Sequence, residues 1–471
     1  MRAFFGAGTI GRRLLALGSV CGLKVDFFID NNPELWGKTI EKIPVISVEE
    51  LKKLPKEPEI FITCKDSSSI YQQLIDSKID AEQIKVFDTT LSMLSYILDS
   101  PKLELPIKIE KKISLDSSAK VVFDLENGFV LGGVESWSLR TAQMLEKMGY
   151  QTAFITDGLL SKGCTTTEDN RISVPYSDTM NQWDRVETLL SLLLQENYNC
   201  FVCNFIGSNF MTACLAKKLF PDSVQLIAVV HNDEDAYYKY YTMMEPWIDK
   251  CFVISEKIKV NLMKMGFPEK KIKYLPWEIR CEDKFEHKYS SYGEKLRIGY
   301  AGRVVIKQKR MDYLISVANK LKKREIPFVL EIAGTGDYVK ELKKEIEKNH
   351  LQSFVRWLGM VESGEIMNFW KNQDIMISCS DWEGHSISQG EAMAAGAVPI
   401  ITDVSGARDD VADGKNGFIV EVGNMEQIIE KIVLLYNQRE RLSEMGENAY
   451  KTIKEKNSRV ELEKLWRDIL K

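Results

Sequence analysis

The stretch Asp374–Ile401, DIMISCSDWEGHSISQGEAMAAGAVPII, runs from an apolar strand through a polar loop into a helix and a second apolar strand. We expect the helix over 387–395, with Gly396 forming the turn that ends it. Elsewhere, short β-rich apolar runs alternate with helical patterns along almost the whole chain. This alternation is typical of α/β layers with mostly parallel sheets, so we predict an α/β fold.

Two polar stretches divide the 471 residues. Residues 100–120 contain two prolines and mixed charge, and residues 278–295 lack a strand pattern. We therefore predict α/β domains at 1–95, 119–280 and 296–450, with a linker over 96–118. The segment 457–471 has the spacing of a helix with one apolar face, and we expect it to join the middle domain.

The composition is that of a globular protein, with 44% apolar and 28% charged residues. Because 63 basic and 68 acidic side chains give a net charge of −5, charge provides no argument for nucleic-acid binding. Nine scattered cysteines favour reduced thiols, and Cys200 and Cys203 lie in an apolar strand without a second pair. With no signal peptide and no apolar run near 18 residues, the sequence predicts a cytoplasmic protein.

Four cations, Arg303, Lys307, Lys309 and Arg310, cluster just after the predicted strand 297–300. Open parallel sheets bind ligands at the carboxyl ends of their strands. Arginine can hold two phosphate oxygens at once, and lysine supplies a mobile point charge. The cluster therefore predicts a phosphate site, with a solvated charge run as the alternative.

Two glutamates follow the strand 374–380, Glu383 on the loop and Glu391 in the first turns of the helix. The helix N-terminus offers N–H groups to a phosphate, and Gly384 leaves room for a ligand. One carboxylate can accept both hydroxyls of a ribose, and the other can accept those of a sugar. The alternative is that both are exposed charges favoured by the helix dipole.

These segments resemble family 4 of the retaining glycosyltransferases in their residues and in their order. The matching motifs are Gly302-Arg303 with Lys309, Gly334-Thr-Gly336-Asp337, Trp357–Val361, and Glu383 with Glu391 and AMAAGAVPII. The resemblance covers about residues 119–471 and implies the GT-B architecture of two facing Rossmann-like domains. It also implies sugar transfer from a nucleotide sugar to a glycan or lipid-linked acceptor, with anomeric retention, no required metal and a role in surface polysaccharide synthesis.

The resemblance implies a role for each matching residue. Arg303 and Lys309 would hold the diphosphate, with Lys307 as the alternative to Lys309 because the spacing is one residue longer than usual. Glu391 would take the ribose hydroxyls, and Glu383 would contact the donor sugar. His231 would face the cleft and bind the sugar or diphosphate, unless it is a structural histidine that caps its strand. Further donor contacts are expected at Gly132, Gly133, Gly302, Met360, Val361, Gly384, His385, Ser386 and Ile387, although His385 and Ser386 stand where the family often has Phe-Gly.

A glycine motif near the amino terminus, Gly6-Ala-Gly8-Thr-Ile-Gly11, lies between a predicted strand over 2–5 and a helix. Asp30 ends the next strand, where an acidic side chain could accept a ribose hydroxyl. The segment resembles the small Rossmann-like domains that precede sugar acyltransferases and nucleotide-sugar-modifying enzymes. We therefore predict a site for a nucleotide or NAD, with a tight turn and close helix packing as the alternative.

Other functions fit parts of this pattern. A sugar-nucleotide epimerase or phosphorylase would share the architecture, a dehydrogenase or cofactor sensor would use the first domain, and a silent partner would bind nucleotide sugars without turnover. The lysines between 257 and 273 fit either a solvated helix face or a peripheral contact with the inner face of the cell membrane.

Overall fold

The computed structural model describes residues 1–20, 23–64, 66–87, 90–99, 119–125, 132–156, 171–173, 182–275, 277–362, 364–456 and 459–470. Most of the predicted linker lies outside these ranges, as do Cys21 and Cys164. The chain divides into two compact units. The first comprises Met1–Phe129, Tyr150–Ala228 and Lys239–Asp249, and the second comprises Val130–Gly149, Val229–Tyr238 and Lys250–Lys471. The domain boundaries predicted from the sequence stay a prediction.

The amino-terminal sheet has six strands in the order β3-β4-β2-β1-β5-β6. Its pairs are parallel except β3 with β4. Short apolar runs form its centre, since the residues of β1 and β5 that face the helices are buried. The strands are β1 (Arg2–Phe5), β2 (Phe27–Ile29), β3 (Thr39–Ile40), β4 (Ile43–Ile46), β5 (Glu59–Ile62) and β6 (Ile84–Val86), and the helices are α1 (Thr9–Val20), α2 (Val48–Leu51), α3 (Ser67–Asp76) and α4 (Thr90–Asp99).

The second sheet has seven strands in the order β13-β12-β11-β10-β7-β8-β9. Cys200 and Cys203 both lie in β10, and burial raises the pKa of each thiol, as expected for inert core cysteines. The strands are β7 (Lys120–Leu125), β8 (Gln151–Thr156), β9 (Arg171–Ser173), β10 (Cys200–Cys203), β11 (Gln225–Val230), β12 (Lys250–Val253) and β13 (Ile272–Tyr274). The accompanying helices are α5 (Gly133–Lys147), α6 (Gln182–Gln195), α7 (Ser208–Leu219), α8 (Asp235–Met243) and α9 (Glu256–Lys264).

The third sheet carries most of the predicted site and has the order β16-β15-β14-β17-β18-β19. Its recorded strand pairs are all parallel, so the carboxyl ends of β14, β15 and β17 meet at one edge. The strands are β14 (Leu296–Ala301), β15 (Phe328–Ala333), β16 (Val355–Gly359), β17 (Ile375–Ser378), β18 (Val398–Thr402) and β19 (Phe418–Val420).

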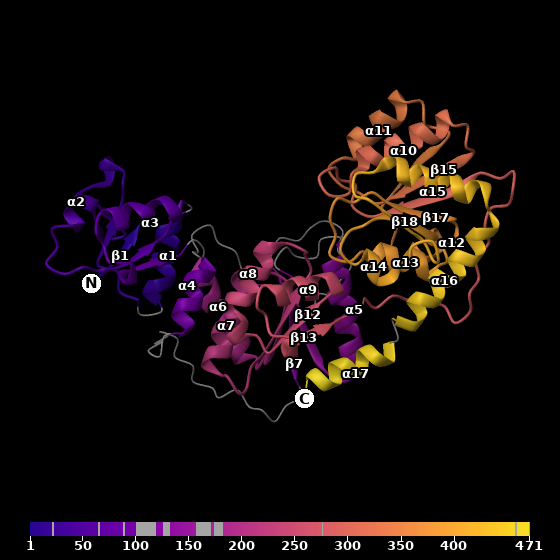
Figure 1. Ribbon diagram of the computed structural model, residues 1–471. Coiled ribbons are helices and arrows are strands. Elements are labelled where there is room, and N and C mark those ends of the chain that lie inside the picture. The colour runs from indigo at the N-terminus through magenta and orange to yellow at the C-terminus, as the bar shows by residue number, and fades with distance from the viewer. Residues whose placement is uncertain are drawn as a thin grey trace. The chain divides into compact units, whose positions relative to one another are not determined.

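Helices cover both faces of this third sheet. In Figure 1, α10 (Met311–Lys323), α11 (Val339–Lys348) and α15 (Met425–Asn437) lie on one side of it. On the other side lie α12 (Ile366–Lys371), α13 (Ile387–Ala394), α14 (Ala407–Asp410) and α16 (Glu440–Lys456). The last helix, α17 (Arg459–Ile469), packs Trp466 edge-on against Phe252 of β12, with ring centroids 5.2 Å apart.

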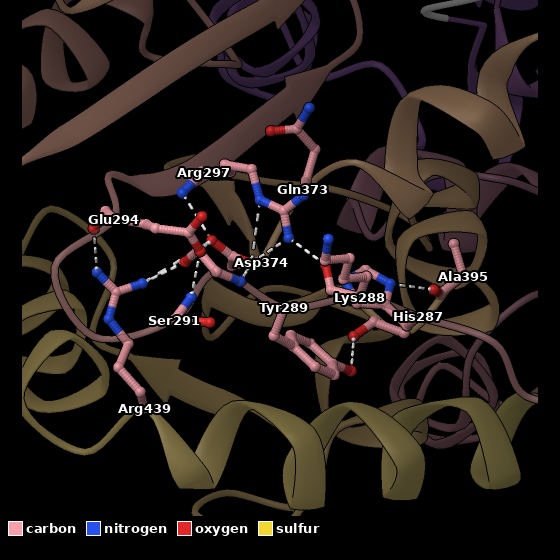
Figure 2. A network of polar contacts seen from close by, with 12 residues as sticks. His287, Lys288, Tyr289, Ser291, Glu294, Arg297, Gln373, Asp374, Ala395 and Arg439 are labelled. Carbon is pink, nitrogen blue, oxygen red and sulfur yellow. Dashed lines mark hydrogen bonds and ion pairs between the residues drawn. The ribbon is translucent and has the colours of Figure 1, made fainter.

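A largely buried polar network fastens the segment 285–295 to this sheet (Figure 2). Asp374, fully buried just before β17, accepts hydrogen bonds from the backbone N–H and hydroxyl of Ser290 at 2.9 and 2.6 Å. Arg297 donates to the same carboxylate, and Arg439 donates to the Ser290 hydroxyl. The buried Asp374 and Arg439 and the half-buried Arg297 thereby satisfy one another, so the segment before β14 is held to the sheet although it contains no strand.

No helix within the described ranges has both the length and the apolar character needed to cross a bilayer. Within the same ranges, no three His, Cys, Asp or Glu side chains gather in a way that would hold a metal ion.

Candidate functional site

The loops that follow β14 and β15 interlock through three glycines. A Cβ atom on Gly334 would lie 1.9 Å from the carbonyl oxygen of Gly302, and one on Gly336 would lie 2.3 Å from that of Val304. Gly334 also has a φ of +135°, a conformation that side chains rarely adopt. The glycines thus allow two backbone loops to touch, which positions the cation-bearing segment 302–310.

Lys309 and Glu383 form an ion pair between the loop after β14 and the loop after β17. Their side chains are 16% and 10% exposed. Gln308 joins the same pair of loops, donating to the Trp382 carbonyl at 3.0 Å, while the Asp381 N–H donates to the Gln308 carbonyl at 2.9 Å. Two residues predicted from separate motifs to serve the donor therefore lie together, and each neutralises the other.

Arg303 is exposed beside this pair and donates to the Gln308 side chain. It also lies close enough to Glu135 of α5 to act on its carboxyl: burial raises the pKa of Glu135, and the Arg303 charge opposes that rise. The other two cations of the cluster differ. Arg310 binds Asp312 and Asp381 and stacks on Tyr313, which makes it a structural residue, whereas Lys307 is exposed.

Glu391 lies in α13, is 8% exposed, and is bound by Arg140 of α5 at 2.9 Å. Burial raises the pKa of Glu391, and the Arg140 charge counteracts that effect. Arg140 also donates to the Glu278 carbonyl at 3.1 Å. The sequence analysis did not single out Arg140, because nothing local in a helix pattern indicates a partner 251 positions away.

The helices α5 and α13 also meet at their N-termini. A Cβ atom on Gly133 would lie 3.5 Å from the Ile387 side chain. Gly132 is the extended residue that precedes α5, and Gly133 is the first residue of this helix. The paired glycines therefore form the helix start, and Ser386 caps α13 by accepting from the Gln389 N–H at 3.3 Å.

Gly384 packs closely against the backbone at the end of β11. A Cβ atom there would lie 1.8 Å from the His231 carbonyl oxygen, so glycine is required by close backbone approach. The His231 ring is buried between Trp137 and Trp277, with centroid distances of 5.6 and 6.1 Å. Burial lowers the pKa of His231 to about 3, so the ring is neutral at physiological pH and offers hydrogen bonding rather than positive charge.

His385 is also buried, and both ring nitrogens face acceptors. Nδ1 lies 2.7 Å from the Ile254 carbonyl oxygen, and Nε2 lies 2.7 Å from the Asp410 carboxylate. Because two acceptors require two N–H donors, the geometry is that of an imidazolium. Burial alone would lower the pKa of His385, but Asp410 raises it above the usual value. The prediction that His385 contacts a donor stays a prediction, and its ring serves to tie down the loop.

Replacing His385 by glutamine should destabilise the protein in a pH-dependent way. A raised histidine pKa adds stability that is fully present below about pH 6.5 and is lost as the pH rises through the folded pKa. The free energy of unfolding of the wild type should therefore exceed that of His385→Gln by roughly 1.5–3 kcal/mol near pH 6, and by less toward pH 9. Calorimetric melts across this range measure the difference. His350→Asn, at an exposed position, is melted in parallel as the control variant, and a difference between wild type and His385→Gln that grows with pH would contradict the assignment.

Met360 and Val361 follow β16 at the same edge of the third sheet. The Gly334 N–H donates to the Gly359 carbonyl at 2.7 Å, which holds this loop beside the glycine loops. Met360 is 51% exposed and Val361 is half-buried. The predicted donor contact, in which the backbone around these two residues would meet the nucleotide base, stays a prediction.

The glycine motif of the amino-terminal sheet serves the local packing in two places. Gly6 has a φ of +112°, and a Cβ atom on Gly11 would lie 1.9 Å from the Gly6 carbonyl oxygen. The Asp30 carboxylate accepts from the Ala7 N–H at 2.8 Å and from the Asn32 N–H at 2.9 Å, so it holds the glycine loop. Gly8 has open space around its Cβ position. Nucleotide or NAD binding here stays a prediction, and these contacts are those of the tight-turn alternative.

Comparison with known proteins adds the following findings. Residues 282–452 match the family model described as Glycosyl transferases group 1. A poly(ribitol-phosphate) alpha-N-acetylglucosaminyltransferase of Staphylococcus aureus is 29% identical over 170 residues, which is 36% of this chain and 34% of the relative. The chain thus spans about a third of that relative's length.

Two solved structures have the same fold. A glycosyltransferase from Rickettsia africae superposes with a TM-score of 0.61 at 19% identity, covering 75% of this chain and 98% of the other. The Anabaena protein HepE, solved with UDP and glucose, superposes with a TM-score of 0.59 at 15% identity, covering 75% of this chain and 99% of the other. These likenesses confirm the predicted α/β fold class of GT-B type. The roles assigned to individual site residues stay predictions.

Proposed function

We propose that this protein is a retaining glycosyltransferase that moves a sugar from a nucleotide sugar to a hydroxyl of a glycan or lipid-linked acceptor. The observation that carries the proposal is the ion pair of Lys309 with Glu383, with Arg303 beside it. A cation can bind the diphosphate of a nucleotide sugar and a carboxylate can accept its sugar hydroxyls, and here the two groups are adjacent. The family model that matches residues 282–452 supports the same reading.

The reaction we propose breaks the bond between the anomeric carbon and the diphosphate oxygen, and the electron pair leaves with the diphosphate. The acceptor oxygen attacks from the same face, and its proton passes to the departing phosphate. Arg303 and Lys309 stabilise the charge that develops on the diphosphate more than they stabilise the ground state, which is what accelerates a reaction. When the donor binds, Lys309 and Glu383 give up their mutual ion pair. Lys309 then contacts the phosphate, and Glu383 contacts the sugar.

The names of similar proteins suggest which substrates to try first. UDP is named with the Anabaena structure, and poly(ribitol-phosphate) with the Staphylococcus relative. We therefore propose a UDP-sugar as donor and a surface polymer of the polyol-phosphate type as acceptor. A cytoplasmic location, at the inner face of the cell membrane, belongs to the same proposal.

The test begins with the full chain and a thermal-shift panel of UDP, GDP, ADP and NAD. One nucleoside diphosphate should raise the melting temperature, because a ligand that binds the folded state stabilises it. The matching nucleotide sugars are then incubated with and without acceptor, and the anomeric configuration of the product is read by NMR. A new sugar nucleotide formed without acceptor would indicate an epimerase, an inverted product would reject retention, and binding without turnover would indicate a silent partner.

Replacing Glu391 by alanine should weaken UDP binding by roughly tenfold to over a hundredfold. The expected cause is the loss of at least one hydrogen bond from a ribose hydroxyl to a charged acceptor, about 1.5–3 kcal/mol. Isothermal titration calorimetry with UDP measures the change, and Glu430→Ala, at an exposed position on α15, is the control. Equal affinities of the Glu391 variant and the wild type would reject the ribose contact.

A further inference from the structure

The Glu391 carboxylate is both buried and charged, a combination that is costly unless a partner compensates it. Arg140 supplies that partner, with Nη2 at 2.9 Å from Oε1 of Glu391. Among the residues that the structure describes, Arg140 is the charged group that acts on this carboxyl. The ion pair therefore decides whether Glu391 is a carboxylate or a protonated acid.

Arg140 is itself held in place on its other side. Its Nη1 donates to the Glu278 carbonyl at 3.1 Å, so two nitrogens of one planar guanidinium bind two separate segments. The same two helices approach at their N-termini, where a Cβ atom on Gly133 would lie 3.5 Å from the Ile387 side chain. The guanidinium thus approaches Glu391 in one orientation and binds Oε1. A carboxylate has about four lone-pair sites, so the acceptor capacity for a diol remains.

We propose that Arg140 is a positioning residue for nucleotide binding, which keeps Glu391 ionised and aims it so that the carboxylate can accept the two ribose hydroxyls. This inference rests on the proposed function. Arg140 acts through Glu391 and is not assigned a contact with the substrate. An alternative role, a latch that blocks Glu391 until a nucleotide displaces it, predicts the opposite change in affinity.

The consequence is a pH dependence that a merely structural arginine would not produce. Without the cation, burial acts unopposed and the pKa of Glu391 rises further. A protonated carboxyl group accepts fewer hydrogen bonds than a carboxylate. Affinity for the ribose should therefore be lost below the raised pKa and recovered above it, so affinity rises with pH.

The first measurement is the UDP affinity of the full chain by calorimetry between pH 6 and pH 9. The compared proteins are the wild type, Arg140→Met, Arg140→Lys and Lys147→Met, the last at an exposed position on the same helix. At each pH the UDP affinity of a variant is divided by that of the wild type, so the effect of the ionisation of UDP itself cancels. Arg140→Met should bind about tenfold or more weakly at pH 6 and approach the wild type near pH 9, as expected for the loss of one charge-assisted contact. The UDP affinity of Arg140→Lys should lie between those of Arg140→Met and the wild type, and that of Lys147→Met should match the wild type.

The second measurement needs no ligand and separates this inference from the proposed function. The Glu391 carboxyl carbon is followed by NMR during a pH titration of glutamate-labelled protein, and it is identified as the signal absent from Glu391→Gln. Its pKa should be higher in Arg140→Met than in the wild type. An unchanged pKa, a pH-independent affinity ratio, or tighter UDP binding by Arg140→Met would overturn the inference. A shifted pKa in a protein that binds no nucleotide would reject the proposed function while leaving the control of Glu391 by Arg140 in place.

Discussion

Replacing Lys309 by alanine should slow sugar transfer by roughly ten- to a few hundredfold while the protein stays folded. One charge-assisted bond to the departing diphosphate is worth about 1.5–3 kcal/mol, and its loss raises the barrier by that amount. The rate is measured as kcat at saturating donor and acceptor. Lys307→Ala is the matched control, because Lys307 is exposed two positions away and lies outside the Lys309–Glu383 pair. Its rate should stay within about twofold of the wild type.

The Lys309 variant has a second effect that must be separated from the first. Removing the cation leaves Glu383, whose side chain is 10% exposed, without its counter-charge. The double variant Lys309→Ala/Glu383→Gln removes that stranded charge. If the double variant transferred sugar at the wild-type rate, the loss would come from Glu383 alone, and Lys309 would have no role at the diphosphate. A loss of equal size in Lys307→Ala would likewise contradict the choice of Lys309.

Replacing Asp374 by alanine should lower the free energy of unfolding by about 3–5 kcal/mol, because it leaves the half-buried Arg297 and the buried Arg439 without their carboxylate. Burial alone would raise the pKa of Asp374, but its hydrogen bonds from Arg297 and Ser290 lower it. The contribution is therefore present above about pH 3.8 and is lost as the pH falls through the lowered pKa.

The control for Asp374 is the exposed pair of Asp403 with Arg408, which has a similar geometry at 2.7 Å. Asp403→Ala should cost less than about 1 kcal/mol, since exposed ion pairs contribute little. Thermal and urea unfolding at pH 7 compare the two variants with the wild type. Equal losses at the two sites would show that burial of the network in Figure 2 does not determine its stability.

Local pattern was enough to predict the elements that carry the site. The apolar run of β17, the loop after it and the helix α13 lie close to the predicted spans, because burial on both faces of a parallel sheet gives continuous apolar runs. The predicted turn at Gly396 is confirmed by its φ of +89° and by the bond from the Ala397 N–H to the Ala392 carbonyl.

Contacts between distant segments could not be predicted in the same way. The family resemblance assigned Lys309 and Glu383 to the diphosphate and the sugar of one donor, but their direct ion pair depends on loop conformation. Arg140 and the Asp374 network depend on side chains that meet only after folding. His385 shows the same limit, because its position on the loop suggested a ligand contact and gave no sign of Asp410, 25 positions later.

The contact of Gly384 with the His231 carbonyl limits how the loop of the proposed sugar site could be redesigned. Any larger residue at 384 would push the loop away from the end of β11, and Glu383 would move with it. Trp382 and Met360 are 40% and 51% exposed, so new side chains at these positions should disturb the packing less. Libraries that vary those two positions and keep glycine at 384 should yield folded variants with altered donor choice.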